Sequence, residues 1–231
     1  MSGPSRDLTT QITDRVAAAS GRVWTPADFA HLGNRDAVDK ALQRLVHADR
    51  LRRVDRGLYD LPRVSALTKR ASTPDYRQVL DALSRRDRVR MLVDGLTAAN
   101  DLGLTDAVPA HVVVHTDTRR RSIKLGGLTI DFRRTAPSRL YWAGRPAMRV
   151  VQALHWLKDM LPGDTDRIVA RLRRILADPK HGPEIRQDLT AGFMVLPRWM
   201  QPIIRELLNE VPKPTDGTSR SARAHASARH G

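Results

Sequence analysis

The chain has 231 residues, of which 41% are hydrophobic, and this length and composition argue against a wholly disordered protein. It carries 40 Lys and Arg against 25 Asp and Glu, a formal net charge of +15, which favours a polyanionic partner such as nucleic acid or an anionic membrane surface. The absence of cysteine excludes disulfides, thiolate metal sites and cysteine nucleophiles. No apolar run approaches the length of a membrane span, and the first residues lack the apolar segment of a signal peptide. We therefore expect a cytoplasmic protein without a membrane partner.

Three short helices are expected at the start of the chain. Apolar residues at helical spacing predict the first helix over about residues 7–19. Thr25-Pro26 is typical of the start of a second, short helix, because Thr can cap a helix and Pro fits its first position. Asn34 can cap the third helix. The core face of the third helix would consist of Val38, Leu42, Leu45 and Val46.

A basic hairpin is expected directly after the third helix. Residues 51–54 and 58–61 are predicted to form two short strands around a turn that contains Gly57, and Pro62 ends the second strand. Three helices followed by a basic hairpin are typical of a winged helix-turn-helix, in which the third helix enters the DNA major groove and the hairpin reaches the flanking backbone. We assign this DNA-binding domain to residues 1–62.

The side chains off the core face of the third helix, together with those of the hairpin, are the candidate DNA contacts. Gln43 and Arg44 are the best candidates for reading bases, because Gln matches an adenine edge and Arg a guanine edge. The remaining candidates suit phosphates better. The alternative is an ordinary solvated helix face. Tyr59 in the hairpin is expected to pack on the first helix rather than to touch DNA. The predicted DNA-binding residues are Arg35, Lys40, Gln43, Arg44, Arg53 and Arg56.

A linker and a second domain are expected to follow. Residues 63–73 have no apolar period and are predicted to be a linker, whereas residues 74–211 carry strand and then helix signals, including a hairpin around Gly126-Gly127. The predicted fold class is therefore α+β, with a winged helix-turn-helix followed by a mixed domain whose helices come late. Residues 212–231 have no large apolar side chain and are predicted to form a disordered basic tail.

The sequence predicts neither catalysis nor a metal or cofactor site. His111 and His115 have the spacing of a metal pair only on a helix, and the Val run between them favours a strand, in which they would lie about 13 Å apart. Asp94, Asp101 and Asp131 could be imagined as nuclease carboxylates, but the first two lie in ordinary turn or helix-end sequences. Common phosphate-loop, hydrolase and zinc-protease motifs are absent.

Five short strings of the chain carry a resemblance to a known family. Residues 24–29 (WTPADF), 34–39 (NRDAVD) and 52–59 (RRVDRGLY) resemble the winged-helix part of AbiEi-type antitoxins. Residues 93–104 (VDGLTAANDLGL) and 141–147 (YWAGRPA) resemble the C-terminal part of one branch of that family, and these two strings are the more specific. The resemblance covers about residues 20–205.

This resemblance implies a bacterial type IV toxin-antitoxin or abortive-infection module. The antitoxin would bind double-stranded operator DNA at an inverted repeat, repress its own operon, and neutralise a nucleotidyltransferase-like toxin without a stable complex. A cationic surface could engage the tRNA or nucleotide that such a toxin uses. The residues expected on this antitoxin surface are Arg133, Arg134, Arg145 and Arg149.

Two alternatives stay open. One is an orphan transcriptional regulator without a toxin. The other is a nucleic-acid-processing factor whose C-terminal sheet is the active part. In that second alternative the basic surface would consist of Arg119, Arg120, Arg121, Lys124, Arg133, Arg134 and Arg145.

Overall fold

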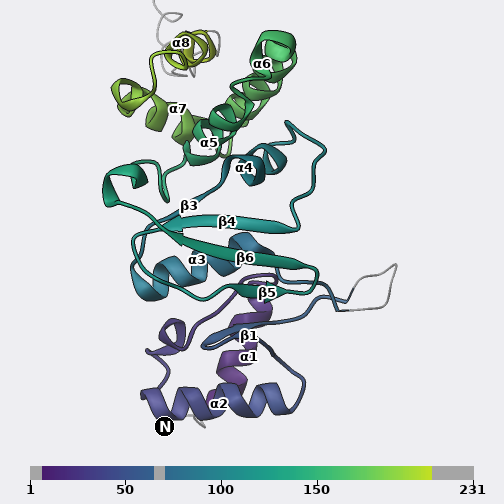
Figure 1. The fold of residues 1–231 in the computed structure, drawn as a ribbon. Helices are drawn as coiled ribbons and strands as arrows, with labels where there is room; N and C mark the ends of the chain where they lie inside the picture. Colours follow the sequence, from purple (N-terminus) through teal and green to yellow (C-terminus); the bar gives the residue numbers. More distant parts are fainter. Residues whose placement is uncertain (1–6, 65–70, 210–231) are drawn as a thin grey trace, which may run out of the picture. The chain divides into compact units, whose positions relative to one another are not determined.

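The computed structural model describes residues 7–64 and 71–209 (Figure 1). Within these residues the fold is mixed α+β, with helices first, two small β-sheets, and further helices late in the chain, as the sequence predicted. The chain divides into two compact units, Met1–Thr165 and Asp166–Gly231, and the division falls inside helix α6 (Leu161–Ala177). The units therefore do not divide at the expected linker. Residues 65–70 of that linker and the expected tail lie outside the described residues.

The first helices begin where the sequence predicts. After α1 (Leu8–Ala18), η1 (Pro26–Phe29) is a single 3₁₀ turn in place of the short helix. The backbone N–H and the hydroxyl of Thr25 both donate to Asp28 Oδ2, over 2.8 and 2.9 Å. Helix α2 (Arg35–His47) begins with Asn34 Oδ1 accepting from the Ala37 backbone N–H at 2.8 Å. These side chains satisfy backbone donors that a helix start leaves free.

One apolar core holds these helices and the hairpin together. Trp24 and Phe29 stack within it, with ring centroids 5.2 Å apart. Tyr59 is only 7% exposed, which confirms the prediction that it packs inward. The buried members of the core are Ile12, Val16, Trp24, Phe29, Val38, Ala41, Leu42, Leu45, Leu51 and Tyr59.

The hairpin consists of β1 (Arg52–Asp55) and β2 (Leu58–Asp60), which pair antiparallel. Gly57 in its turn has φ +68°, a conformation that favours glycine. Trp24 adds a third short segment, because its N–H donates to the Tyr59 carbonyl at 2.7 Å and its carbonyl accepts from the Tyr59 N–H at 2.9 Å. This order of three helical segments and a hairpin is consistent with a winged helix-turn-helix.

The second sheet belongs to the same unit. Its strands stand in the order β3-β4-β6-β5, with β4 and β6 parallel and the other pairs antiparallel. The Gly126-Gly127 turn joins β5 to β6, as predicted. Helices α4 and α5 lie together on one side of this sheet (Figure 1). The elements are α3 (Tyr76–Asp87), β3 (Met91–Val93), α4 (Gly95–Asp101), β4 (His111–Thr116), β5 (Ile123–Leu125), β6 (Leu128–Arg134), η2 (Pro137–Leu140) and α5 (Met148–Leu157).

Helices α4 and α5 approach each other closely at Gly95. A Cβ atom at this position would lie 2.5 Å from Trp156 Cβ and 2.7 Å from the Gln152 carbonyl oxygen. Both distances are shorter than real side chains adopt, so only glycine fits at the start of α4 without moving the α5 backbone.

The last unit contains the end of α6, α7 (Gly182–Ala191), η3 (Phe193–Val195) and α8 (Gln201–Asn209). The apolar stripes that predicted late helices are buried, including Ile168, Leu172 and Ile204, each 0% exposed. Among the described residues, no helix combines the length and the apolar character needed to cross a membrane.

Candidate nucleic-acid interface

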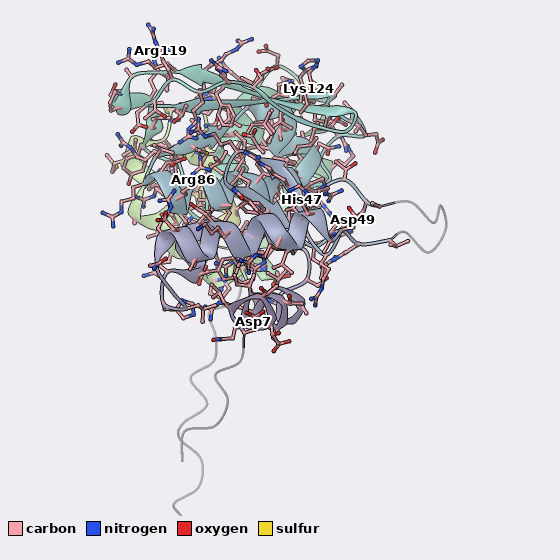
Figure 2. All side chains as sticks on the ribbon, turned by 90° about the horizontal axis from the view of Figure 1, so that it is seen from below. Asp7, His47, Asp49, Arg86, Arg119 and Lys124 are labelled. Carbon is pink, nitrogen blue, oxygen red and sulfur yellow. The ribbon has the colours of Figure 1, made fainter. Side chains whose placement is uncertain are left out.

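Helix α2 presents one buried and one exposed face. The exposed face carries the predicted contacts Arg35, Lys40, Gln43 and Arg44. The buried face consists of Val38, Ala41, Leu42 and Leu45. Because a helix repeats every 3.6 residues, this apolar stripe fixes which side chains point outward. Figure 2 looks onto α2 and labels His47 and Asp49 at its C-terminal end.

The charges on this face differ in how far they are neutralised. Arg35 Nε donates to Asp39 Oδ2 at 3.3 Å, although the Arg35 side chain is 81% exposed. Among the described residues, the side chains of Lys40, Gln43 and Arg44 have no hydrogen-bond or ion-pair partner. Their polar groups are therefore available to a ligand.

Two neighbouring arginines of β1, Arg52 and Arg53, lie in different environments. Arg52 is turned inward, where it donates to both carboxylate oxygens of Asp60, at 2.9 and 2.5 Å, and to the Ser72 carbonyl at 2.8 Å. Arg53 and Arg56 are exposed. Strand alternation points Arg53 away from Arg52, and Arg56 is exposed because it lies in the turn between β1 and β2. Both predicted contacts are therefore open, whereas Arg52 supports the hairpin.

A cluster that the sequence did not reveal holds the turn of the hairpin. Arg86, near the end of α3, donates from Nη1 to the Arg56 carbonyl at 2.9 Å. It also donates from Nε and Nη2 to the two oxygens of Asp87, both at 2.9 Å, and Arg120 donates to Asp87 Oδ2 at 2.5 Å. We call Arg86, Asp87 and Arg120 the arginine clamp. The hydrogen bond from Arg86 lowers the pKa of the Asp87 carboxyl, partial burial opposes this, and Arg120 adds to the lowering.

The four residues expected on an antitoxin surface fall into different environments. Arg133 and Arg134, at the end of β6, are exposed. Arg145 lies over the rings of Tyr141 and Trp142, at 4.5 and 5.6 Å from their centroids.

The fourth, Arg149, donates from Nε to Asp101 Oδ2 at 2.7 Å, so its charge is neutralised inside the fold. The four arginines therefore do not form a uniformly open cationic face.

Asp101 is the centre of a buried polar cluster at the end of α4. Its side chain is only 4% exposed and accepts hydrogen bonds from Tyr76, Arg77 and Arg149. Burial alone would raise the pKa of Asp101, but these three donors together hold it below its usual range. Burial, followed by the hydrogen bond to Asp101, raises the pKa of Tyr76. The cluster joins α3, α4 and α5 through a single carboxylate.

The other carboxylates considered for catalysis are also engaged. Asp94 caps α4 through the Thr97 N–H at 3.0 Å and accepts from the Val113 N–H of β4 at 2.9 Å. Asp131 contacts His111 Nδ1 at 2.9 Å and accepts from the Ser122 hydroxyl at 2.6 Å. In residues 7–64 and 71–209 no group of three His, Asp or Glu side chains is arranged to hold a metal ion.

Comparison with known proteins adds one finding. The model of a family described as a family of unknown function (DUF6088) matches residues 11–177, which include α2, the hairpin, the four-stranded sheet and α6. No curated protein matches the chain. These two results assign no activity to the chain.

Proposed function

We propose that the chain, which belongs to the DUF6088 family of unknown function, is a sequence-specific, double-stranded-DNA-binding regulator of transcription that acts in the cytoplasm. The observation that carries this proposal is the exposed face of α2, where Lys40, Gln43 and Arg44 have no partner among the described residues. A hairpin with Arg53 and Arg56 exposed follows this helix. The formal net charge of +15 supports a polyanionic partner.

We further propose that the regulator is the antitoxin of a type IV toxin-antitoxin pair. This proposal rests on the resemblance to AbiEi-type antitoxins. The protein would repress its operon from an inverted-repeat operator and neutralise a nucleotidyltransferase-like toxin without forming a stable complex. Arg133 and Arg134 are the first candidates for the neutralising surface, because both are exposed. We favour this function over nucleic-acid processing because Asp94, Asp101 and Asp131 all accept hydrogen bonds within the fold.

Arg44→Ala is expected to weaken specific operator binding by about 1 to 3 kcal/mol and to relax the preference at one base pair. Arg44 is exposed and can fork onto a guanine edge, whereas non-specific binding rests on phosphates and should hardly change. Operators are first selected from a random duplex pool, and point-substituted operators then compete for each variant.

Arg198→Ala is the matched control, since Arg198 is an exposed arginine of the last unit. The base-reading assignment of Arg44 fails if Arg44→Ala ranks every operator variant as the wild type does, at the same affinity.

The antitoxin proposal is tested by co-expression with the gene that neighbours this one. The neighbour is expected to arrest growth alone, and the full chain to restore growth even when both genes stand under unrelated promoters. Arg133→Ala combined with Arg134→Ala should weaken the rescue while the ranking of operators is kept, because neither residue lies on α2 or the hairpin. Rescue that occurs only from the native promoter would show that repression alone protects the cell.

A further inference from the structure

A short basic loop joins β4 to β5, and its three successive arginines do not point the same way. Arg119 and Arg121 are exposed, and neither has a hydrogen-bond or ion-pair partner in the part of the chain that the structure describes. The side chain of Arg120, between them, is turned inward and is only 16% exposed. Two cations are thus displayed, and the third anchors the loop.

A series of hydrogen bonds connects Arg120 to the hairpin of the first sheet. Arg120 donates to Asp87, Asp87 accepts two hydrogen bonds from Arg86, and Arg86 donates to the carbonyl of Arg56 in the hairpin turn. The arginine clamp therefore holds the basic loop and the hairpin turn at opposite ends of one hydrogen-bonded chain. Charge-assisted hydrogen bonds of this kind are strong and also fix the relative orientation of the groups that they join.

Beside the clamp lies a groove of about 470 Å³, which we call the loop groove. Asp55 of β1, Leu83 of α3 and Phe132 of β6 line it together with the clamp and the basic loop. Its charged lining consists of four arginines and two aspartates, so its net charge is positive. The groove thus adjoins a strand of the hairpin and carries two displayed guanidinium groups on its rim.

The labelled side chains place this region in relation to α2. In the view that looks onto α2, Arg86 appears between that helix and Arg119, and Lys124 of β5 lies on the same side of α2 as Arg119 (Figure 2). Because Asp55 of β1 lines the same groove as Arg119 and Arg121, the hairpin and the basic loop border one surface.

We propose that the loop groove is a second phosphate-contacting element, in which Arg119 and Arg121 bind the backbone of the same DNA duplex that α2 reads. This inference rests on the proposed DNA-binding function and extends it, because it carries the footprint past the winged helix onto the four-stranded sheet. Exposed guanidinium groups suit phosphates, and such contacts add affinity and position without reading sequence. Arg86, Asp87 and Arg120 act as positioning residues that present the loop.

The test measures the affinity of the full-length chain for a random-sequence duplex of about three helical turns, about 30 base pairs, across a range of salt concentrations. Arg119→Ser combined with Arg121→Ser should flatten the slope of log affinity against log salt by about 1.8, because each lost phosphate contact removes about 0.9. Arg119→Lys combined with Arg121→Lys should retain most of the slope. Operator ranking should stay as in the wild type, since no base contact is removed.

The double variant Lys180→Ser and Arg198→Ser removes the same charge from exposed residues of the last unit and serves as the control. An equal change of slope in this control would overturn the inference, because net charge alone would then explain the effect. An unchanged slope in the Arg119 and Arg121 variant, with duplex binding intact, would overturn the inference and leave the proposed function standing. A wild-type chain that binds single-stranded RNA but no duplex would overturn both.

Discussion

Replacing Leu42 by Ala is expected to lower the free energy of unfolding by about 2 to 5 kcal/mol and to abolish operator binding. Leu42 is 0% exposed and lies on the buried face of α2. Truncation removes apolar contacts and leaves a cavity that the packed neighbours fill only in part. Because few buried side chains hold α2 on its core, the exposed face that we propose to contact DNA would lose its fixed orientation when one of them is truncated. Urea unfolding and operator titration, on the same preparation, measure the two effects.

Val108→Ala is the control for this change, since Val108 is 83% exposed and its truncation should alter stability by no more than about 0.5 kcal/mol. A Leu42→Ala protein as stable as the wild type would mean that α2 does not dock through this face.

Replacing Asp101 by Asn is the change with the next largest expected effect. It removes the one carboxylate that Tyr76, Arg77 and Arg149 share. Arg149 then loses this counter-charge, and Arg77 keeps the contact of its Nη1 with Asp75 Oδ2 at 3.7 Å. Breaking a fully buried pair costs about 3 to 5 kcal/mol. The Arg77 and Arg149 side chains are 46% and 33% exposed, and solvent screens them, so we expect a loss of about 2 to 3 kcal/mol.

The effect of Asp101→Asn depends on pH in a defined direction. The pKa of Asp101 is lower in the folded chain than its usual value of about 3.9, so the ionised carboxylate stabilises the fold fully above that value. This contribution is lost as the pH falls through the lower folded pKa. The stability difference between wild type and variant should therefore be constant near neutral pH and shrink in acid.

Asp81→Asn makes the same chemical change on the exposed side of α3, where Asp81 pairs with Arg85 one turn away. Its side chain is 57% exposed, so the expected loss is about 0.5 kcal/mol or less. A loss for Asp101→Asn no greater than this would contradict the shared-carboxylate account.

Local patterns carried most of what could be predicted from the sequence. Asn34 caps α2, Gly126-Gly127 turns the hairpin, and the apolar period of α2 leaves Gln43 and Arg44 exposed, because each of these features depends on residues within a few positions of one another. The third segment at Trp24 was missed, because its bridge to Tyr59 joins residues that no local pattern connects.

Long-range ion pairs escaped prediction for the same reason. Arg149 was expected on an open surface, but its partner Asp101 lies 48 residues earlier in the chain. The arginine clamp likewise joins residues 33 positions apart, and nothing in the surrounding sequence distinguishes Arg86 or Arg120 from a solvated arginine. The sequence gives the number of charged residues, but which of them form ion pairs depends on the fold.

The order of the four-stranded sheet has a consequence for how the protein is made. β6 lies between β4 and β5 and is the last of the four strands to be synthesised. On the ribosome, β4 can pair with β3 as soon as both have emerged, but its other edge stays open until Arg134 has left the exit tunnel. An unpaired edge is the part of a sheet that other chains join most readily. The open edge of β4 is therefore exposed while residues 117–134 emerge from the exit tunnel, and slow translation during that interval would prolong the exposure.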